Sequence, residues 1–319
     1  MTSSSDLSIG IDIGGTKILG GVVDSHGTII DSERRDTPTE DGRKTISEIA
    51  AVVKNLSARH PVSEVGVSIA GFMSKDRKRM ETNPNISNLE GIEIHDELEQ
   101  ATGLAVHLEN DGNSAAWGEF KFGAGKGSNP MLMVTVGTGI GGGLIIDSKL
   151  LIGAFGTAGE VGHVAVKHGG DICGCGMRGC LEQYASGNAL RRYVRGAIES
   201  TPARGAAILA KGDGSVAGIE GAHITAAARE GDSIALAAFS EIGEWLGIGL
   251  AGFAAVLDPE RIVIGGGVID AGEILLDPIK SSLLRHSPMR SSHPMPEVVA
   301  AKLGNTAGIV GVADLARIT

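Results

Sequence analysis

The chain has 319 residues, 42% of them hydrophobic and 21% charged, which is an ordinary composition for a globular protein with enough material for two domains. A formal net charge of −10 argues against nucleic acid as the main partner, and the opening MTSSSDLSIG lacks the basic and apolar segments of a secretory signal. Because the three cysteines cannot all pair with one another and no export signal is visible, we expect a cytoplasmic protein.

The first sixty residues predict a strand meander followed by a helix. Ile9, Ile11 and Ile13 alternate with other residues before two glycines, apolar residues resume to residue 23, and the turn DSHG leads to a strand at 28–30. Apolar residues then recur with helical spacing over 46–56, and Pro61 ends that helix.

Further along the chain, VGVSIAG predicts a buried strand, and a strand at 106–108 precedes ENDGNSAAWGEF, which predicts a loop and then a helix. Helices are also expected at 186–198, 233–256 and 306–317, with a strand in RIVIGGG. The most apolar stretch, 245–257, is too short to span a bilayer, so we expect a buried helix and no membrane partner.

The centre of the chain repeats its beginning. MVTVGTGIGGGLIID can be laid on IGIDIGGTKILGGVVD without gaps, which matches Gly14 to Gly137 and Asp24 to Asp147. A chance match is the alternative, because the repeat is short. The shared strand, Gly/Thr turn and second strand nevertheless predict two similarly built α/β domains.

Glycine-rich turns follow three of the predicted strands. DIGGTK has neither the Walker nor the GxGxxG spacing, and it leads into a strand instead of a helix. One such turn is typical of a simple hairpin, but backbone N–H groups at several of them favour a nucleotide site, and Asp12 beside the first could hold Mg²⁺ through water. The phosphate-binding candidates are Gly14, Gly15, Thr16, Lys17, Gly137, Thr138, Gly139, Gly265 and Gly266.

All the cysteines lie in CGCGMRGC, at positions 173, 175 and 180. Three thiolates and a histidine form a common structural zinc set, and the glycines between them would let the chain bend around one ion. The spacing differs from the usual zinc-finger pattern, and three ordinary buried thiols are the alternative. His163 and His168 both qualify as the fourth ligand.

DIGGTK, ENDGNSAAWGE, TVGTGIGGGLI, GTAGEVGH and CGCGMRGCLEQYASG resemble, in this order, the motifs of the ROK sugar kinases, most closely the glucokinases of that family. The resemblance runs from about residue 7 to the C-terminus. It implies an actin-like, ribonuclease-H-like α/β fold, with one domain over 1–120 plus 303–319 and a larger one over 121–302. It also implies ATP-dependent phosphorylation of glucose at its 6-hydroxyl, and a dimer or tetramer.

The same resemblance implies residue roles. It selects His163 over His168 as the zinc ligand beside Cys173, Cys175 and Cys180, with its second ring nitrogen directed at the sugar. It makes Asp111, not its neighbour Glu109, the catalytic base that orients the attacking hydroxyl. The sugar ligands that it implies are Gly71, Asn85, Asn110, Asp111, Glu160, His163 and Glu182.

Other readings stay open at this point. A kinase for N-acetylmannosamine, N-acetylglucosamine or fructose would share nearly all these motifs. A sugar-responsive repressor of the family would carry a helix-turn-helix domain before the first strand, and the roughly eight residues found there are too few for one. A polyphosphate-dependent kinase would be expected to show a basic track, which the sequence does not suggest.

Overall fold

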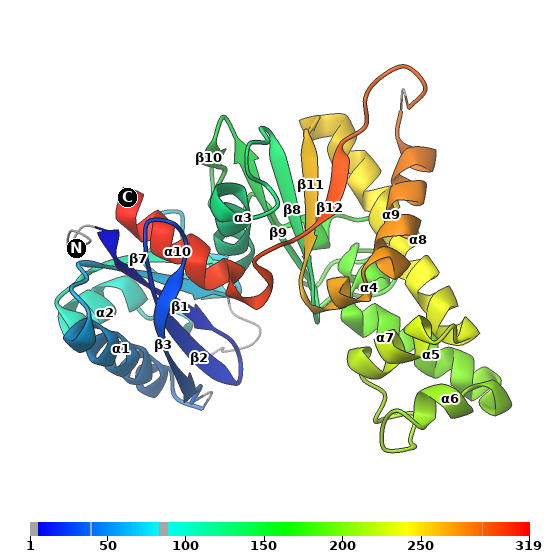
Figure 1. Ribbon diagram of the computed structural model, residues 1–319, viewed down its shortest axis with the longest axis horizontal. Helices are drawn as coiled ribbons and strands as arrows, with labels where there is room; N and C mark the ends of the chain where they lie inside the picture. Colours follow the sequence, from blue (N-terminus) through cyan, green and yellow to red (C-terminus); the bar gives the residue numbers. More distant parts are fainter. Residues whose placement is uncertain (1–5, 39, 83–88, 289) are drawn as a thin grey trace. The chain divides into compact units, whose positions relative to one another are not determined.

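The computed structural model describes residues 6–38, 40–82, 89–288 and 290–319. Strands in this part of the chain form two five-stranded sheets and one two-stranded sheet (Figure 1). The first sheet has the order β3-β2-β1-β4-β7, with bounds Ile29–Asp36, Lys17–Val23, Ser8–Ile13, Glu64–Ile69 and Ala105–Asn110. The second has the order β10-β9-β8-β11-β12, with bounds Lys149–Leu150, Ile140–Ile146, Met131–Val136, Arg261–Gly265 and Glu297–Ala300. The short pair is β5 (Phe72–Met73) and β6 (Met80–Thr82).

The two large sheets confirm the internal repeat. β1 and β8 are both six residues long, and β2 and β9 are both seven. A three-residue turn joins β1 to β2, and another joins β8 to β9. The strand orders also correspond, because in each sheet the first hairpin and the third strand beside it are followed by two later strands on the other side. The third strands differ in length, with eight residues in β3 and two in β10. Two sheets of one topology are the expected signature of an actin-like fold.

The helices lie between and after these strands. Their bounds are α1 Gly42–Arg59, α2 Ile94–Thr102, α3 Asp111–Phe122, α4 Glu182–Ala185, α5 Gly187–Ser200, α6 Ala206–Leu209, α7 Gly221–Arg229, α8 Ser233–Leu257, α9 Glu273–His286 and α10 Ala307–Ile318. The helix expected at 46–56 begins earlier, since the Asp41 carboxylate accepts hydrogen bonds from the backbone N–H groups of Arg43 and Lys44.

The described chain divides into two compact units. Unit 1 contains residues 1–133, 142–159 and 302–319, and unit 2 contains 134–141 and 160–301. The domain boundaries expected after residues 120 and 302 stay a prediction.

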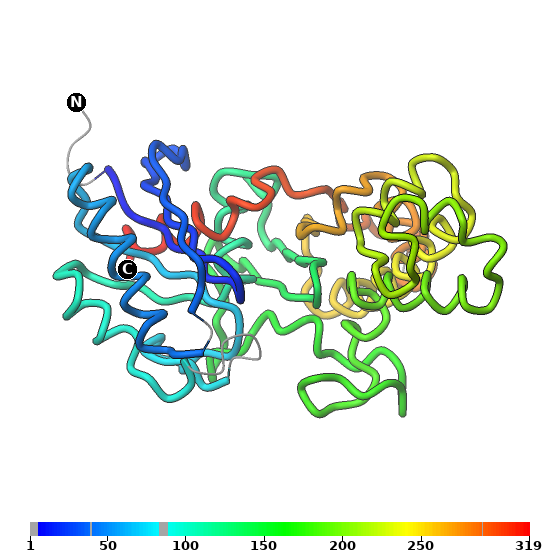
Figure 2. Tube along the Cα trace, turned by 90° about the horizontal axis from the view of Figure 1, so that it is seen from below, coloured from blue at the N-terminus to red at the C-terminus, as the bar shows by residue number. Residues whose placement is uncertain are grey.

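Unit 1 is closed by its C-terminal helix. α10 lies against β1 and β4, as the red helix beside the blue strands shows (Figure 2). This close approach requires glycine on the strands: a Cβ at Gly10 would stand 2.1 Å from the Ile309 carbonyl oxygen, and one at Gly66 would stand 2.0 Å from that of Val312. The chain therefore brings its last residues onto its first strand.

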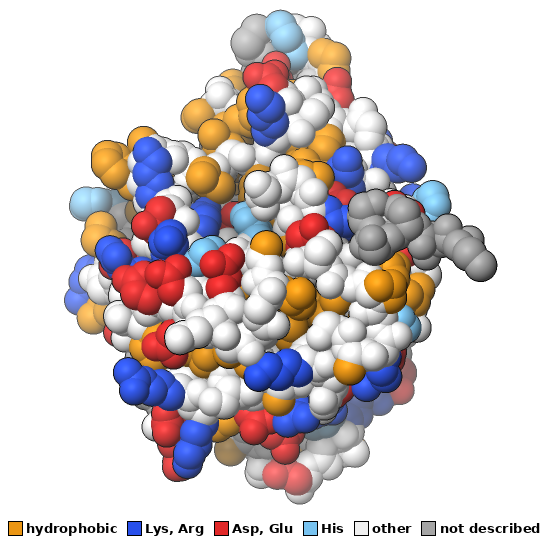
Figure 3. Space-filling view, turned by 90° about the vertical axis from the view of Figure 1, so that its left-hand side faces the viewer, with side chains coloured by type: hydrophobic (Ala, Val, Ile, Leu, Met, Phe, Trp, Pro, Cys, Tyr) orange, Lys and Arg blue, Asp and Glu red, His pale blue; other side chains and the backbone are white. Residues whose placement is uncertain are grey.

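The face of the molecule drawn in Figure 3 carries acidic and basic side chains interspersed with one another. In unit 1, ion pairs join β3 to α1: Arg35 Nη1 lies 2.7 Å from Glu48 Oε2, and Arg59 Nε lies 2.8 Å from Asp31 Oδ2. These pairs are partly exposed, so each adds little to stability.

Two expectations from the sequence were wrong. No loop separates β7 from α3, because Asn110 ends the strand and caps the helix that starts at Asp111. The apolar helix is also longer than the stretch 245–257: α8 is, by length and composition, the one helix among the described residues able to cross a membrane. It begins at Ser233, as the expected helix at 233–256 does, because Asp232 caps it, and 61% of its most apolar window is buried inside the protein.

Candidate metal centre and phosphoryl-transfer site

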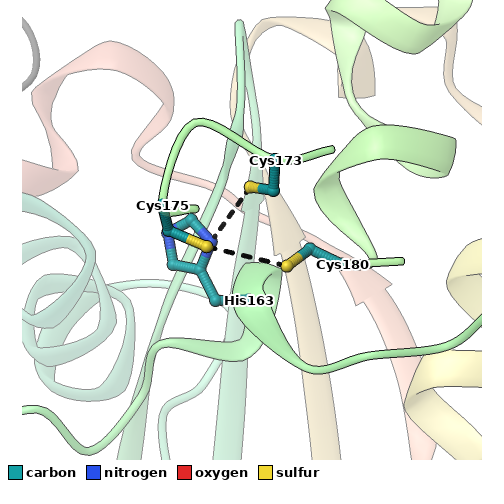
Figure 4. A group of neighbouring side chains, drawn as sticks. All are labelled: His163, Cys173, Cys175 and Cys180. Atoms are coloured by element: carbon teal, nitrogen blue, oxygen red, sulfur yellow. Dashed lines mark hydrogen bonds between the residues drawn. The ribbon is translucent and has the colours of Figure 1, made fainter. Parts of the chain in front are cut away.

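The predicted zinc ligands come together in unit 2. His163, Cys173, Cys175 and Cys180 each direct one ligand atom at a common point, and these atoms all lie within 4.8 Å of one another (Figure 4). The Cys175 and Cys180 sulfurs are 3.7 Å apart, and zinc–sulfur bonds of 2.3 Å in a tetrahedron would set them about 3.8 Å apart. The donor set is therefore compatible with a structural zinc ion.

The histidine presents a defined nitrogen to this cluster. Nδ1 of His163 lies 3.6 Å from Sγ of Cys173, which makes Nδ1 the metal-facing atom and leaves Nε2 pointing elsewhere. His168 is not part of the cluster. Four protein ligands fill a tetrahedral zinc site, so the ion would hold the loop and would not activate water.

Glycines shape the cysteine loop, although not all those expected are needed. Gly176 and Gly179 have φ angles of 87° and 80°, a region that favours glycine, and a Cβ at Gly179 would stand 1.8 Å from the Lys167 carbonyl oxygen. Gly174 has open space around its Cα and no positive φ. The expectation that Gly174 is required for the bend is therefore not supported by its surroundings.

Glu182 connects the metal cluster to the second glycine turn. Its Oε1 lies 3.7 Å from Sγ of Cys173, and its Oε2 accepts a hydrogen bond of 3.0 Å from the backbone N–H of Ile140. A Cβ at Gly139 would stand 2.1 Å from the same Oε2, so this turn position must be glycine for Glu182 to lie where it does.

Two further predicted residues flank a short 3₁₀ helix, Val161–His163. Glu160 precedes the helix as its N-cap residue, and His163 is its last residue. A Cβ at Gly162 would stand 2.1 Å from the Ile140 carbonyl oxygen, so glycine lets this helix pack directly on β9. The motif GEVGH thus combines one residue required for packing with two polar residues beside the turn that holds Glu182.

In unit 1, two carboxylates meet at the carboxyl ends of the parallel strands β1, β4 and β7. Asp12 on β1 accepts a 3.2 Å hydrogen bond from Ser68 Oγ on β4, and Asp111 directly follows β7. Burial, and then the nearby charge of Asp111, raises the pKa of Asp12 to about 6. Such strand ends are the usual ligand-binding edge of an α/β sheet.

Asn110 and Asp111 form the junction of β7 with α3. Asn110 Oδ1 accepts the Asn113 backbone N–H and its Nδ2 donates to the Gly71 carbonyl, so this predicted sugar ligand also has a structural role. One Asp111 oxygen accepts the Gly112 N–H at 2.9 Å, and the side chain keeps an exposed surface that a substrate can reach. The protein enclosing it on its other sides raises the pKa of Asp111.

The first glycine turn joins β1 to β2. The Gly14 N–H donates to the Lys17 carbonyl at 2.9 Å, and Thr37 Oγ1 donates to the Gly14 carbonyl at 2.8 Å. Thr16 is exposed at the tip, and Lys17 is half-buried. The turn that was expected to face phosphate is therefore fixed by its own backbone and by Thr37, the residue after β3.

Unit 2 contains a cavity of about 610 Å³, a size typical of small-molecule sites. Gly137 and Thr138 line it as expected, and their carbonyls accept N–H bonds from Gly187 and Asn188 at the start of α5. Gly266, predicted beside them, is needed for packing: its φ is 85°, and a Cβ there would stand 2.4 Å from the Val136 carbonyl oxygen.

Most of the cavity comes from residues that the sequence reasoning did not select. They are Gly187, Leu190, Arg191, Gly221, Ala222, Thr225, Ala226, Arg229, Gly267, Val268 and Asp270. One feature of the sequence could have pointed to them, namely the small residues on one face of α7. These residues leave room for a flat ring, and they are Gly221, Ala222, Thr225 and Ala226.

The predicted site residues are thus distributed over both units. Asp12, Gly14, Gly15, Thr16, Lys17, Gly71, Asn110 and Asp111 belong to unit 1, and Gly137, Thr138, Gly139, Glu160, His163, Glu182, Gly265 and Gly266 belong to unit 2. Asn85 lies outside the described residues.

Comparisons with known proteins agree on one family. The model of the ROK family matches residues 8–318. The chain is 45% identical over 311 residues to a glucokinase of Streptomyces coelicolor, covering 98% of both chains, and 34% identical over 262 residues to an N-acetylmannosamine kinase of Yersinia pseudotuberculosis, covering 82% of both. Among solved structures, it resembles a ROK family glucokinase from Streptomyces griseus in complex with glucose and AMPPNP, with 47% identity, a TM-score of 0.90 and coverage of 98% of this chain and 100% of that one.

Proposed function

Because this chain belongs to the ROK family, we propose that it is an ATP-dependent glucokinase, which transfers the terminal phosphoryl group of ATP to the 6-hydroxyl of D-glucose. The observation that carries this proposal is the near full-length similarity to a glucokinase whose structure holds glucose and an ATP analogue. The fold is the actin-like ATPase fold of these kinases.

Asp111 is the proposed catalytic base. Phosphoryl transfer has a largely dissociative transition state, so the base mainly orients the attacking hydroxyl and accepts its proton late. Asp111 suits this role because one of its oxygens is fixed by the Gly112 N–H while its surface stays accessible. The positive N-terminus of α3 also stabilises the carboxylate.

The proposed sugar ligands are polar groups that can hydrogen-bond to sugar hydroxyls, and they are Gly71, Asn85, Asn110, Glu160, His163 and Glu182. Asn110 retains capacity for this, since each of its amide atoms has used one of its two bonds. Zinc, when bound, supplies no chemical step. It would be held by His163, Cys173, Cys175 and Cys180, and it would fix the imidazole so that Nε2 is directed at a sugar hydroxyl.

The nucleotide is proposed to bind with its adenosine in the 610 Å³ cavity of unit 2. The turns Gly14–Lys17 and Gly137–Gly139 are the proposed phosphate ligands, because their backbone N–H groups suit oxyanions. Gly265 and Gly266, predicted to border the adenosine, do not line this cavity, whereas the next residue, Gly267, does. Mg²⁺ neutralises the phosphate charge when bound, and Asp12 would hold it through water.

The specific alternative is a kinase for another hexose, and the similarity to the Yersinia N-acetylmannosamine kinase supports keeping it in the test. The experiment is ATP turnover, followed by coupled ADP detection, on glucose, N-acetylmannosamine, N-acetylglucosamine and fructose. We expect the highest kcat/KM with glucose. A higher value with any other sugar would reject the glucokinase proposal while retaining the kinase class.

We also propose a cytoplasmic location and a homo-oligomer, a dimer or tetramer, without nucleic-acid or membrane partners. The net charge of −10 supports the expectation of no nucleic-acid partner, and the largely buried α8 supports that of no membrane partner. Light scattering at several concentrations tests the oligomeric state, and a monomer at all of them would reject that part.

A further inference from the structure

Arg77 and Glu109 form a buried ion pair in unit 1. Arg77 Nη2 lies 3.0 Å from Glu109 Oε1, and the two residues are 7% and 2% exposed. A charge this deep in a protein is held in place only when it has a partner, because removing one member leaves the other charged and without water. Among the described residues, Arg77 is the cation that lies within ion-pair distance of Glu109.

The Glu109 carboxylate fixes the junction that carries Asp111. The same Oε1 accepts the backbone N–H of Asn110 at 2.8 Å and the Nδ2 group of Asn113 at 3.0 Å. One oxygen therefore connects the last residue of β7 to the first turn of α3, and Asp111 stands between the two points of attachment. Without Arg77 beside it, the Glu109 carboxylate would be a buried charge with no cation near it. It would turn toward water and release its hydrogen bonds to Asn110 and Asn113.

Arg77 also holds a second segment. Its Nη1 donates to the Gly156 carbonyl at 3.1 Å. Gly156 has a φ of 85°, and a Cβ there would stand 3.2 Å from Nη1, so the loop approaches the guanidinium closely. This loop leads along the chain directly to Glu160, one of the proposed sugar ligands.

The backbone of Arg77 is strained in a way that serves this arrangement. Its φ is 57°, in the left-handed region that residues with a side chain rarely occupy. The turn is held by the Arg77 N–H, which donates to the Ser74 carbonyl at 2.9 Å, and by the Lys78 N–H, which donates to Ser74 Oγ at 3.2 Å. Asparagine or glycine would be less strained at position 77. The protein has arginine there, and its planar guanidinium reaches both Glu109 and the loop at Gly156.

We propose that Arg77 is a positioning residue for phosphoryl transfer: by neutralising Glu109 and binding the Gly156 carbonyl, it holds Asn110 and Asp111 in the orientation that the reaction requires. This inference rests on the proposed function of Asp111. It predicts an effect on kcat beyond any loss of stability, since a catalytic group displaced by about 1 Å can cost roughly 100-fold in rate.

The test uses two variants of the full-length protein and a matched control. Arg77→Lys keeps the charge but loses the fork, and Arg77→Met with Glu109→Gln removes both buried charges, so that the protein can fold without an unpaired one. Arg79→Met is the control, because Arg79 lies in the same turn, is 43% exposed and forms looser pairs with Glu81 and Glu93 at 3.3 and 3.4 Å. kcat and KM are measured well below the melting temperature of each variant.

We expect kcat to fall about 10- to 100-fold in both test variants with a smaller change in KM, and to stay within about twofold in the control. Hydrogen exchange should also accelerate in Arg77→Lys, in peptides covering 105–115 and 152–159. Unchanged kcat in both test variants overturns the proposal, and so does a fall in kcat without faster exchange in either peptide. If the unsubstituted protein phosphorylates no hexose, the proposed function fails instead, and the exchange result alone decides whether Arg77 couples the two segments.

Discussion

Sγ of Cys173 lies 3.7 Å from Oε1 of Glu182, so a predicted zinc ligand directly adjoins a predicted sugar ligand. A structural ion placed here would influence substrate binding without taking part in the chemistry. The same carboxylate is held by the Ile140 N–H, so the cysteine loop, α4 and the second glycine turn form one connected group.

Removal of zinc is therefore expected to weaken glucose binding as well as stability. Loss of a group that orients a ligand without touching the substrate typically costs about 10- to 100-fold in affinity. The measurement is calorimetric titration of glucose into metal-stripped protein that circular dichroism shows to be folded, with zinc added back as the control. Equal affinities with and without zinc would reject the link between metal and sugar.

Asp111→Ala should leave glucose binding measurable and reduce turnover by about 10²- to 10⁴-fold, the range expected for a general base. Asp96→Asn is the matched control, since Asp96 is an exposed carboxylate on α2 of the same unit. Coupled ADP detection measures the rate, and a glucose titration measures binding. Near-normal turnover of the alanine variant would remove Asp111 from the mechanism.

Asp12→Asn should stabilise the protein at pH 7.5 while impairing catalysis. Burial raises the pKa of Asp12 in the native state to about 6, above its ordinary value of 3.8. The native state therefore favours the protonated carboxyl, and the stability gained from its protonation is lost as the pH rises through 6. The neutral amide avoids that loss, which we expect to raise the free energy of unfolding by ~1 to 3 kcal/mol. Denaturant unfolding without nucleotide or Mg²⁺ measures it.

The pH dependence of this difference is its internal control. Below about pH 4, Asp12 is protonated in both the native and the unfolded state, so the two proteins should become equally stable. A stabilisation that persists unchanged at low pH would mean that the amide acts through packing and not through charge.

Gly139→Ala should raise the KM for glucose more than it lowers kcat. A Cβ at this position would stand 2.1 Å from Oε2 of Glu182 and displace that carboxylate from the Ile140 N–H. Gly196→Ala on α5 is the control, because a Cβ there meets nothing within 4 Å. Steady-state kinetics of both variants test this, and an unchanged KM in the first would separate Glu182 from sugar binding.

Local patterns in the sequence were sufficient to predict the two similar hairpins and the cysteine ligands. Strand alternation and glycine turns act over a few residues, and the three cysteines lie so close in the chain that any compact loop brings them together. The position of Asp111 at a strand end followed in the same way, although the predicted loop after the strand does not exist.

The tertiary structure decided what lies between distant segments. The pairing of Arg77 with Glu109, the contact of Arg77 with Gly156, and the cavity lined by α5 and α7 each join residues far apart in sequence, and no local period encodes them. The hydrogen bond from Asn110 Nδ2 to the Gly71 carbonyl likewise depends on β4 and β7 lying side by side, whereas the capping bond from the Asn113 N–H to Asn110 is local. Such contacts follow from how whole elements pack, because buried charges and close backbone approaches are satisfied only by neighbours that the fold supplies.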